Sequence, residues 1–422
     1  MNVGILCASI GFGGAQNTTA SLASELSRQG HDVTLYIDKS RFRSLEDVGH
    51  LRIVDIPRDS PLSMLWGHCP ARSLVSAIRG IRALKHQALL LMSDGHLPIA
   101  VLARWFCRVP CVYYELGPRM HARTRFFRGL VVANSEETRD LLANWLHRSA
   151  KDIPVVRARV NVERLSKAAG RAGVGQAAGR PVSIAMASRL EDEKIPAVLL
   201  VIDAVRMLSA AGRNVRLHIY GGGKDIEDVR KHVAKAGGEC PADLVRIHGF
   251  VRSVPDELAD RDICIGVGRG AWEGMACGKP TVVVGKEGLG GVVCPANLER
   301  LMRHNFTARG RRSKPDATEI ADALRPLVED PAHRRRLGGY GLTVMREHYD
   351  VKLGAAQIAS VLGETSRQGV GSRGLGDALR VCGVVLLSFW LVVKEVGLWC
   401  LRPRVPMQSL AKAHALKNGR DN

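Results

Sequence analysis

The chain has 422 residues, of which 46% are hydrophobic and 44 are glycines. This length exceeds one ordinary core and predicts two domains. The 61 Lys and Arg residues outnumber the 41 Asp and Glu residues, and the net charge of +20 predicts attraction to polyanions: phosphorylated ligands, nucleic acid or an anionic membrane face. The ten cysteines are scattered without zinc-ligand spacing, and the N-terminus lacks a signal-peptide pattern. We therefore expect reduced thiols, no metal site and a cytoplasmic location.

Short β-rich segments alternate with longer helical segments in the first part of the chain. A glycine-rich turn at 11–14 and a helical stretch at 15–28 follow the first of these segments. The expected strands cover 2–9, 32–37, 51–56, 88–93, 110–115 and 129–135. Strands separated by helices predict a parallel sheet, so we expect a Rossmann-like domain over residues 1–165.

The alternation stops and then restarts in the middle of the chain. Residues 166–180 are small and aperiodic, which predicts a linker. Beyond them the expected strands cover 182–188, 215–221, 245–250, 262–268 and 281–285. We predict an α/β protein with a second doubly wound, Rossmann-like domain over 181–362 and a cleft between the two domains. Ligands of such sheets bind beyond the carboxyl ends of the strands.

The last segment, 363–422, differs in composition. Residues 381–393 carry no charge, but this run is shorter than the ~20 residues that a membrane-spanning helix needs. From residue 364 onward, nine Lys and Arg residues face four Asp and Glu residues. An apolar stretch with basic flanks is typical of an interfacial or core-docking helix, and it suits an anionic lipid surface.

Three segments at strand ends could hold a phosphate group. Glycines in "GFGGAQ" (11–16) let backbone amides approach an anion at the start of a helix. In "SRLEDEK" (188–194), Arg189 and Lys194 together could neutralise a diphosphate. "YGGGKD" (220–225) repeats the strand–glycine–helix pattern. Tight turns and a solvated charged loop are the alternative interpretations.

The order of these segments resembles the family 4 glycosyltransferases, which have the GT-B fold of two Rossmann-like domains. The resemblance covers roughly residues 1–362. "SRLEDEK" is similar to the family's G-R-L-x-x-x-K, and "IYGGGKD" is similar to its G-x-G. "EGMACGKPTVV", which begins at Glu273, is similar to E-A-M-A-x-G-x-P-V-V, and 155–165 resembles the inter-domain segment with Asn161 in the place of an acid.

The resemblance implies a hexosyltransferase that uses a UDP- or GDP-sugar and no cofactor, in cell-envelope or exopolysaccharide synthesis. Arg189 and Lys194 would stabilise the leaving diphosphate. Glu273 would accept hydrogen bonds from the ribose hydroxyls, because a carboxylate offers two acceptor oxygens to a diol. The other donor-binding candidates are Gly13, Gly14, Gly222, Arg269, Gly290 and Gly291, with 288–291 as a phosphate loop.

The sequence also departs from the family pattern. Ile265 stands where the family usually carries a further glutamate beside the donor sugar. His96 is our candidate for the family's histidine near the reacting carbon, with Glu115 and His121 nearby in the chain. The family usually retains anomeric configuration. Ile265 leaves open a nucleotide-sugar-binding protein that has lost transfer activity. A further alternative is an enzyme of the same fold with other chemistry, such as sugar epimerisation.

The basic segment "RMHARTRFFR" (119–128) carries four arginines interleaved with two phenylalanines. Arginines can pair with phosphates while phenylalanines enter an interface, so we expect peripheral docking on the inner face of the membrane. Stacking on nucleic acid is the rival interpretation. No helix-turn-helix, zinc or RNA-binding signature supports it. The expected partners are therefore the donor, a saccharide or lipid-linked acceptor and an anionic membrane.

Overall fold

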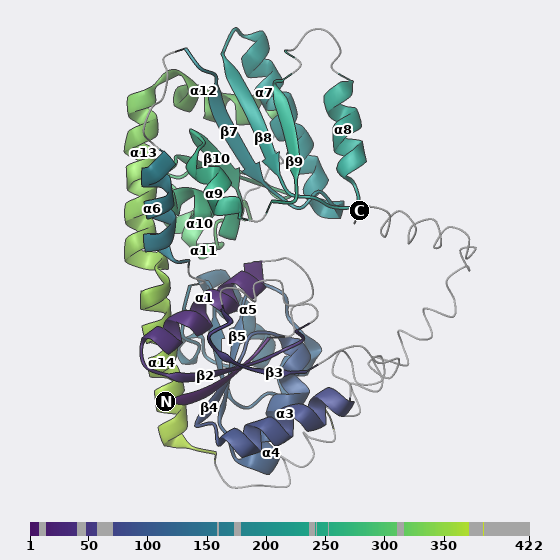
Figure 1. The fold of residues 1–422 in the computed structure, drawn as a ribbon, viewed down its shortest axis with the longest axis vertical. Coiled ribbons are helices and arrows are strands. Elements are labelled where there is room, and N and C mark those ends of the chain that lie inside the picture. Colours follow the sequence, from purple (N-terminus) through teal and green to yellow (C-terminus); the bar gives the residue numbers. More distant parts are fainter. Residues whose placement is uncertain are drawn as a thin grey trace, which may run out of the picture.

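Two α/β units are stacked along the long axis of the molecule in the computed structural model (Figure 1). The structure describes residues 1–7, 14–39, 48–56, 71–157, 160–172, 179–235, 241, 243–251, 253–309, 316–370 and 383. The predicted fold class, two doubly wound sheets in series, is confirmed. Most of the tail, Gly13 and the rest of the 11–13 turn lie outside the described residues.

The sheet of the first unit has six parallel strands in the order β3-β2-β1-β4-β5-β6. Its strands are β1 (Asn2–Leu6), β2 (Asp32–Ile37), β3 (Arg52–Asp55), β4 (Ala88–Leu91), β5 (Cys111–Glu115) and β6 (Leu130–Ala133). Each lies within or matches a predicted strand. The crossover connections bring the carboxyl ends of all six strands to one edge of the sheet.

The second sheet has the order β12-β11-β10-β7-β8-β9, and only β12 runs antiparallel to its neighbour. Its strands are β7 (Val182–Ala187), β8 (Val215–Tyr220), β9 (Val245–Gly249), β10 (Ile263–Gly266), β11 (Thr281–Gly285) and β12 (Gly288–Val292). The strand β12 replaces the open loop that we expected over 288–291, because this segment turns back and pairs with β11.

Helices cover both faces of each sheet. Those before residue 180 are α1 (Gly14–Arg28), α3 (Ala71–Leu84), α4 (Leu97–Cys107), α5 (Glu136–Leu146) and α6 (Val162–Ala172). Those after it are α7 (Ile195–Ala210), α8 (Ile226–Ala234), α9 (Val254–Ala259), α10 (Arg269–Ala276), α11 (Leu298–Arg303), α12 (Ala317–Glu329), α13 (Pro331–Val344) and α14 (Val351–Gln368).

Burial on both faces explains why the strands read as nearly continuous apolar runs. In β1, Ile5 packs on one face with residues of α1 and α14, and Leu6 packs on the other with α3 and α4. In β8, Leu217 joins α7 and α12, whereas Tyr220 joins α10 on the opposite face. Alternate side chains of each strand thus build two cores per unit.

Within the described residues, the chain crosses between the units twice, and the two crossings lie side by side. The N–H of Val160 donates to the carbonyl of Tyr349 at 3.0 Å, and the N–H of Val351 donates back to Val160 at 2.9 Å. After the second crossing, α14 returns to the first unit and buries Ile358 and Leu362 against its sheet. Figure 1 shows α13 and α14 following each other along one side of both units.

The structure differs from the sequence expectation at these crossings. The helix α6 begins at Val162, within the predicted first domain, and covers half of the predicted linker. Its residues Val162 and Leu165 are buried in the core of the second unit. A short helix with an apolar face gains more from this packing than a solvated linker would. Likewise α14, expected in the second domain, supplies apolar side chains to the first.

Two findings bear on the membrane expectation. Within the part of the chain that the structure describes, no helix is both long and apolar enough to cross a bilayer. Phe127 is buried and packs edge-on against Tyr113, with 6.0 Å between the ring centroids. The expectation that both phenylalanines of 119–128 enter an interface is therefore wrong for Phe127, because the fold uses this side chain as core.

Candidate functional site

The candidate residues of the second unit follow the carboxyl ends of neighbouring strands, where parallel sheets bind ligands. Arg189 and Lys194 come after β7, and Arg269 begins α10 directly after β10. The first turn of α10 also adjoins the end of β7: a Cβ atom on Gly270 would lie 3.7 Å from the carbonyl oxygen of Ala187. The fold therefore brings the 188–194 segment and the N-terminus of α10 to one edge of the sheet.

Arg189 and Lys194 were predicted to act together as a pair of cations. The Arg189 side chain is 58% exposed and pairs with Glu191, while that of Lys194 is 27% exposed. Burial lowers the pKa of Lys194, and the positive charge of Arg189 lowers it further, although Glu193 and Glu287 oppose both effects. An anion placed between the two cations would relieve their mutual repulsion. The pair is thus suited to a diphosphate, which would replace the acidic partners.

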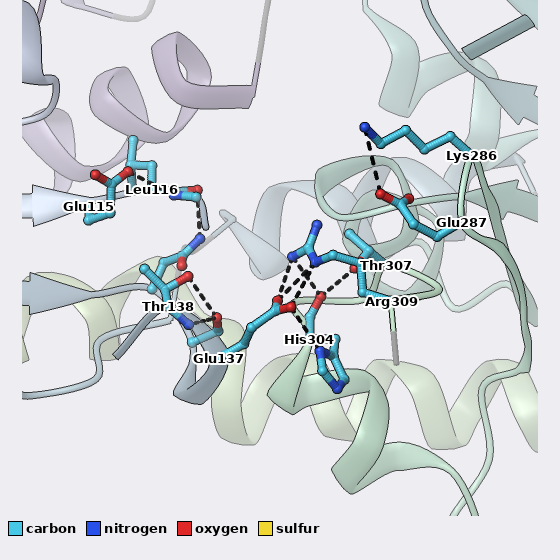
Figure 2. Close-up of polar contacts among 12 residues, drawn as sticks. Glu115, Leu116, Glu137, Thr138, Lys286, Glu287, His304, Thr307 and Arg309 are labelled. Carbon is cyan, nitrogen blue, oxygen red and sulfur yellow. Dashed lines mark hydrogen bonds and ion pairs between the residues drawn. The ribbon is translucent and has the colours of Figure 1, made fainter. Parts of the chain in front are cut away.

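Lys286 is a further cation at this edge that we did not predict. It follows β11, and its Nζ atom lies 2.6 Å from Oε2 of Glu193. The hydrogen bond from Lys286 lowers the pKa of Glu193, and Arg119 of the first unit acts in the same direction. Figure 2 shows Lys286 beside Glu287, at 3.7 Å. The signal was present in the sequence, since Lys286 follows a buried strand just as Arg189 does.

Glu273 and Arg269 lie one turn apart on α10. Glu273 is 7% exposed, and its Oε1 accepts a hydrogen bond from Nε of Arg269 at 2.7 Å. The Nη1 atom of Arg269 lies 3.5 Å from Oγ1 of Thr18 on α1. The start of α1 is also near, because a Cβ atom on Gly14 would lie 3.7 Å from Cβ of Arg269. Arg269 therefore joins the predicted ribose-binding carboxylate to the first unit.

The glycines at the strand ends have packing roles. Gly221 has a φ of +136°, and a Cβ atom there would lie 2.0 Å from the carbonyl oxygen of Ser188. A Cβ atom on Gly222 would lie 2.6 Å from the Phe250 ring. The approach at Gly221 requires glycine and brings the loops after β7 and β8 together, whereas the exposed Phe250 ring, which follows β9, can move away from a side chain at position 222. Contact of Gly222 with a nucleotide stays a prediction.

The glycines of β12 are also held by packing. A Cβ atom on Gly290 would lie 2.9 Å from Val283. The carbonyl of Gly290 accepts a hydrogen bond from Nη2 of Arg300 at 2.8 Å, and Gly291 has a φ of +92°. Pairing with β11 and these contacts explain why the segment is rich in glycine. A role of Gly290 and Gly291 in phosphate binding remains a prediction.

In the first unit, His96 after β4 and Glu115 at the end of β5 are buried, whereas the His121 side chain is 35% exposed and its Nδ1 lies 3.3 Å from Oδ2 of Asp94. His96 ends the short 3₁₀ helix Asp94–His96 and is only 2% exposed, so a substrate could touch it only after a rearrangement. Glu115 is 6% exposed and accepts hydrogen bonds from Oη of Tyr113 at 2.6 Å and from the N–H of Gly117 at 3.1 Å. Burial raises the pKa of Glu115 to about 7 despite these hydrogen bonds.

Two family models match the chain. The model described as "Glycosyltransferase Family 4" matches residues 12–164, and the model described as "Glycosyl transferases group 1" matches residues 181–330. Together they account for more than half of the chain and divide it as the two sheets do. No curated protein sequence matches the chain.

Several solved structures share the fold. HepE from Anabaena, in complex with UDP-glucose, is 19% identical with a TM-score of 0.63, over 86% of this chain and 100% of that chain. A glycosyltransferase from Rickettsia africae is 15% identical with a TM-score of 0.63, over 86% and 98%. Sucrose-phosphate synthase from Thermosynechococcus elongatus is 16% identical with a TM-score of 0.61, over 87% and 100%. Identities this low establish a common fold.

Proposed function

The chain belongs to the family 4 glycosyltransferases with the GT-B fold, and we propose that it transfers a hexose from a nucleoside-diphosphate sugar to an acceptor hydroxyl. The observation that carries this proposal is the shared sheet edge of two features: the cations Arg189 and Lys194, and the N-terminus of α10 with Glu273. The first can hold a diphosphate, and the second a ribose. The UDP-glucose bound to HepE supports a UDP-sugar as the donor.

The chemistry follows from charge. When the bond between the sugar C1 and the diphosphate oxygen breaks, negative charge grows on the leaving diphosphate. C1 bonds to the acceptor oxygen, and the proton of the acceptor hydroxyl passes to the departing diphosphate. Arg189, Lys194 and the positive end of α10 stabilise that charge. The ribose diol replaces Arg269 as the partner of Glu273. We propose that these groups act without a metal ion or other cofactor, so that EDTA leaves turnover unchanged. We also propose that the transfer retains the configuration at C1.

The test begins with calorimetric titration of the purified protein with UDP and GDP. Turnover of UDP- and GDP-hexoses is then followed with and without saccharide acceptors, with NMR of the product's anomeric configuration. Binding followed by acceptor-dependent release of the diphosphate supports the proposal. Binding without turnover favours the nucleotide-sugar-binding alternative, and conversion of the donor alone to another sugar favours an epimerase. A protein that binds neither nucleotide overturns the proposal.

We further propose that the enzyme acts in the cytoplasm on cell-envelope or exopolysaccharide acceptors and docks peripherally on the inner face of the membrane. The support is compositional: the uncharged run 381–393 and the excess of basic residues around it. Basic residues near an anionic surface each contribute roughly 1 kcal/mol, screened by salt. Sedimentation with anionic and neutral liposomes tests this. Salt-insensitive binding that is equal on both lipids contradicts it.

A further inference from the structure

The loop of residues 304–309 directly follows α11. It contacts both the first unit and helix α10, which carries the proposed donor-binding residues Arg269 and Glu273. Asn305 and Phe306 in this loop have φ values of +56° and +53°. Residues other than glycine rarely adopt this left-handed backbone conformation, so the loop needs support from its surroundings. Two separate sets of contacts provide that support.

The first set joins the loop to Glu137, in the first turn of α5. The Oε2 atom of Glu137 accepts hydrogen bonds from Nε and Nη2 of Arg309 at 2.9 and 2.7 Å, and Oε1 lies 3.1 Å from Nδ1 of His304 (Figure 2). Burial alone would raise the pKa of Glu137, but the hydrogen bonds and charge of Arg309 lower it. The carboxylate is thus charged and largely enclosed by the loop of the opposite unit.

The second set joins the loop to α10. The carbonyl of Phe306 accepts a hydrogen bond from the N–H of Gly268, the residue before α10, at 2.8 Å. The Phe306 ring is fully buried and meets Tyr349 edge-on at 5.5 Å, and Tyr349 lies 5.3 Å from Trp272 of α10. A change in the backbone at Phe306 would therefore move Gly268, the residue that immediately precedes α10.

We propose that Glu137 is a positioning residue for the donor: it holds the 304–309 loop in the conformation that sets the N-terminus of α10. The inference rests on the proposed function, because Arg269 and Glu273 of α10 are the groups assigned to the donor. Glu137 belongs to the first unit and the loop to the second. The geometry of the donor site therefore depends on how the two units are placed.

The variant Glu137→Gln tests this proposal, because it keeps the size of the side chain and removes the charge that holds Arg309. We expect the dissociation constant for UDP or GDP, whichever the wild type binds, and the KM for the donor to rise about tenfold. We expect kcat to change by less than about twofold and the melting temperature to stay within about 2 °C, since the surrounding cores are intact.

Glu136→Gln is the matched control. Glu136 is the neighbouring residue on α5, and it pairs with Arg157 of its own unit. This variant should bind nucleotide like the wild type. In a second arm, Glu137→Arg combined with Arg309→Glu restores the ion pair with reversed charges and should recover most of the lost affinity.

Each outcome decides the question. Wild-type affinity in Glu137→Gln, or an equal loss in Glu136→Gln, overturns the positioning role while leaving the proposed function intact. Failure of the charge-reversed pair to recover affinity also contradicts it. A wild-type protein that binds neither UDP nor GDP overturns the proposed function and this inference together.

Discussion

The two units differ in how they present their ionisable groups at the strand ends. In the second unit, Arg189 and Lys286 extend into solvent and pair with the half-buried Glu191 and the exposed Glu193, respectively. In the first unit, His96 and Glu115 are almost completely buried. An exposed cation can exchange its acidic partner for an anionic ligand with little change in desolvation, whereas a buried acid holds its hydrogen bonds and resists ionisation. We therefore predict that the anionic part of a ligand binds at the exposed cations of the second unit, whose Glu273 is an exception because it is as buried as Glu115.

The largest effect should follow removal of the donor-side cations. Arg189→Ala and Lys194→Ala should each lower kcat by about 10²–10³, because the charge on the diphosphate grows in the transition state. Steady-state kinetics with a nucleotide-sugar donor measures this. Arg213→Ala is the control, since Arg213 precedes β8 and pairs with Glu329 away from the carboxyl ends of the strands. Wild-type kcat in both cation variants would move the diphosphate site elsewhere.

The buried acid of the first unit should show itself in the pH dependence of stability. The pKa of Glu115 is raised from 4.5 to about 7 in the folded protein, so the folded state binds this proton more tightly than the unfolded chain. The free energy of unfolding should therefore fall by about 3 kcal/mol as pH rises through this interval. Glu115→Gln cannot ionise and should lack this decrease.

Urea unfolding at pH 5 and pH 8 measures this difference. The free energy of unfolding of Glu115→Gln, relative to that of the wild type, should rise by about 3 kcal/mol between pH 5 and pH 8. Glu347→Gln, at an exposed carboxylate, should follow the wild type at both. Parallel pH profiles for Glu115→Gln and the wild type would show that the buried acid does not control stability.

Glu273→Gln should weaken donor binding by about 1.5–3 kcal/mol, because a hydrogen bond from the ribose to a charged acceptor is replaced by one to a neutral amide. Calorimetry with UDP and GDP gives the affinity. Glu257→Gln, on α9, is a comparable variant outside the site, where Glu257 pairs with Arg261. Unchanged affinity in Glu273→Gln would contradict the assignment of this residue to the ribose.

Lys286→Ala should give the smallest effect, a loss of about threefold in nucleotide affinity that disappears at high salt. The reason is that exposed charges are strongly screened. Titrations at low and high ionic strength test this. If Lys286→Ala and Arg189→Ala lower nucleotide affinity equally in the same titrations, Lys286 contacts the diphosphate directly.

Local sequence patterns were sufficient for the strands of both sheets other than β12. Both ends of the strand 32–37 were predicted correctly, because the turn residues on either side of an apolar run mark where the strand begins and ends. Arg189, Lys194 and Glu273 were selected because their short motifs resemble those of the family, and their roles stay predictions. The helix α6 and the strand β12 were not predicted, since packing against distant segments decides their form.

The sequence by itself determined the alternation of strands and helices, and with it the edge of each sheet at which ligands bind. Backbone preferences and apolar periodicity act over a few residues, so these features can be read locally. Only the tertiary structure decided which side chains meet across the units. Glu137 and Arg309 are 172 residues apart in the chain, and Thr18 and Arg269 are 251 apart. Such pairs depend on strand order, on the double crossing of the chain and on the placement of the two units.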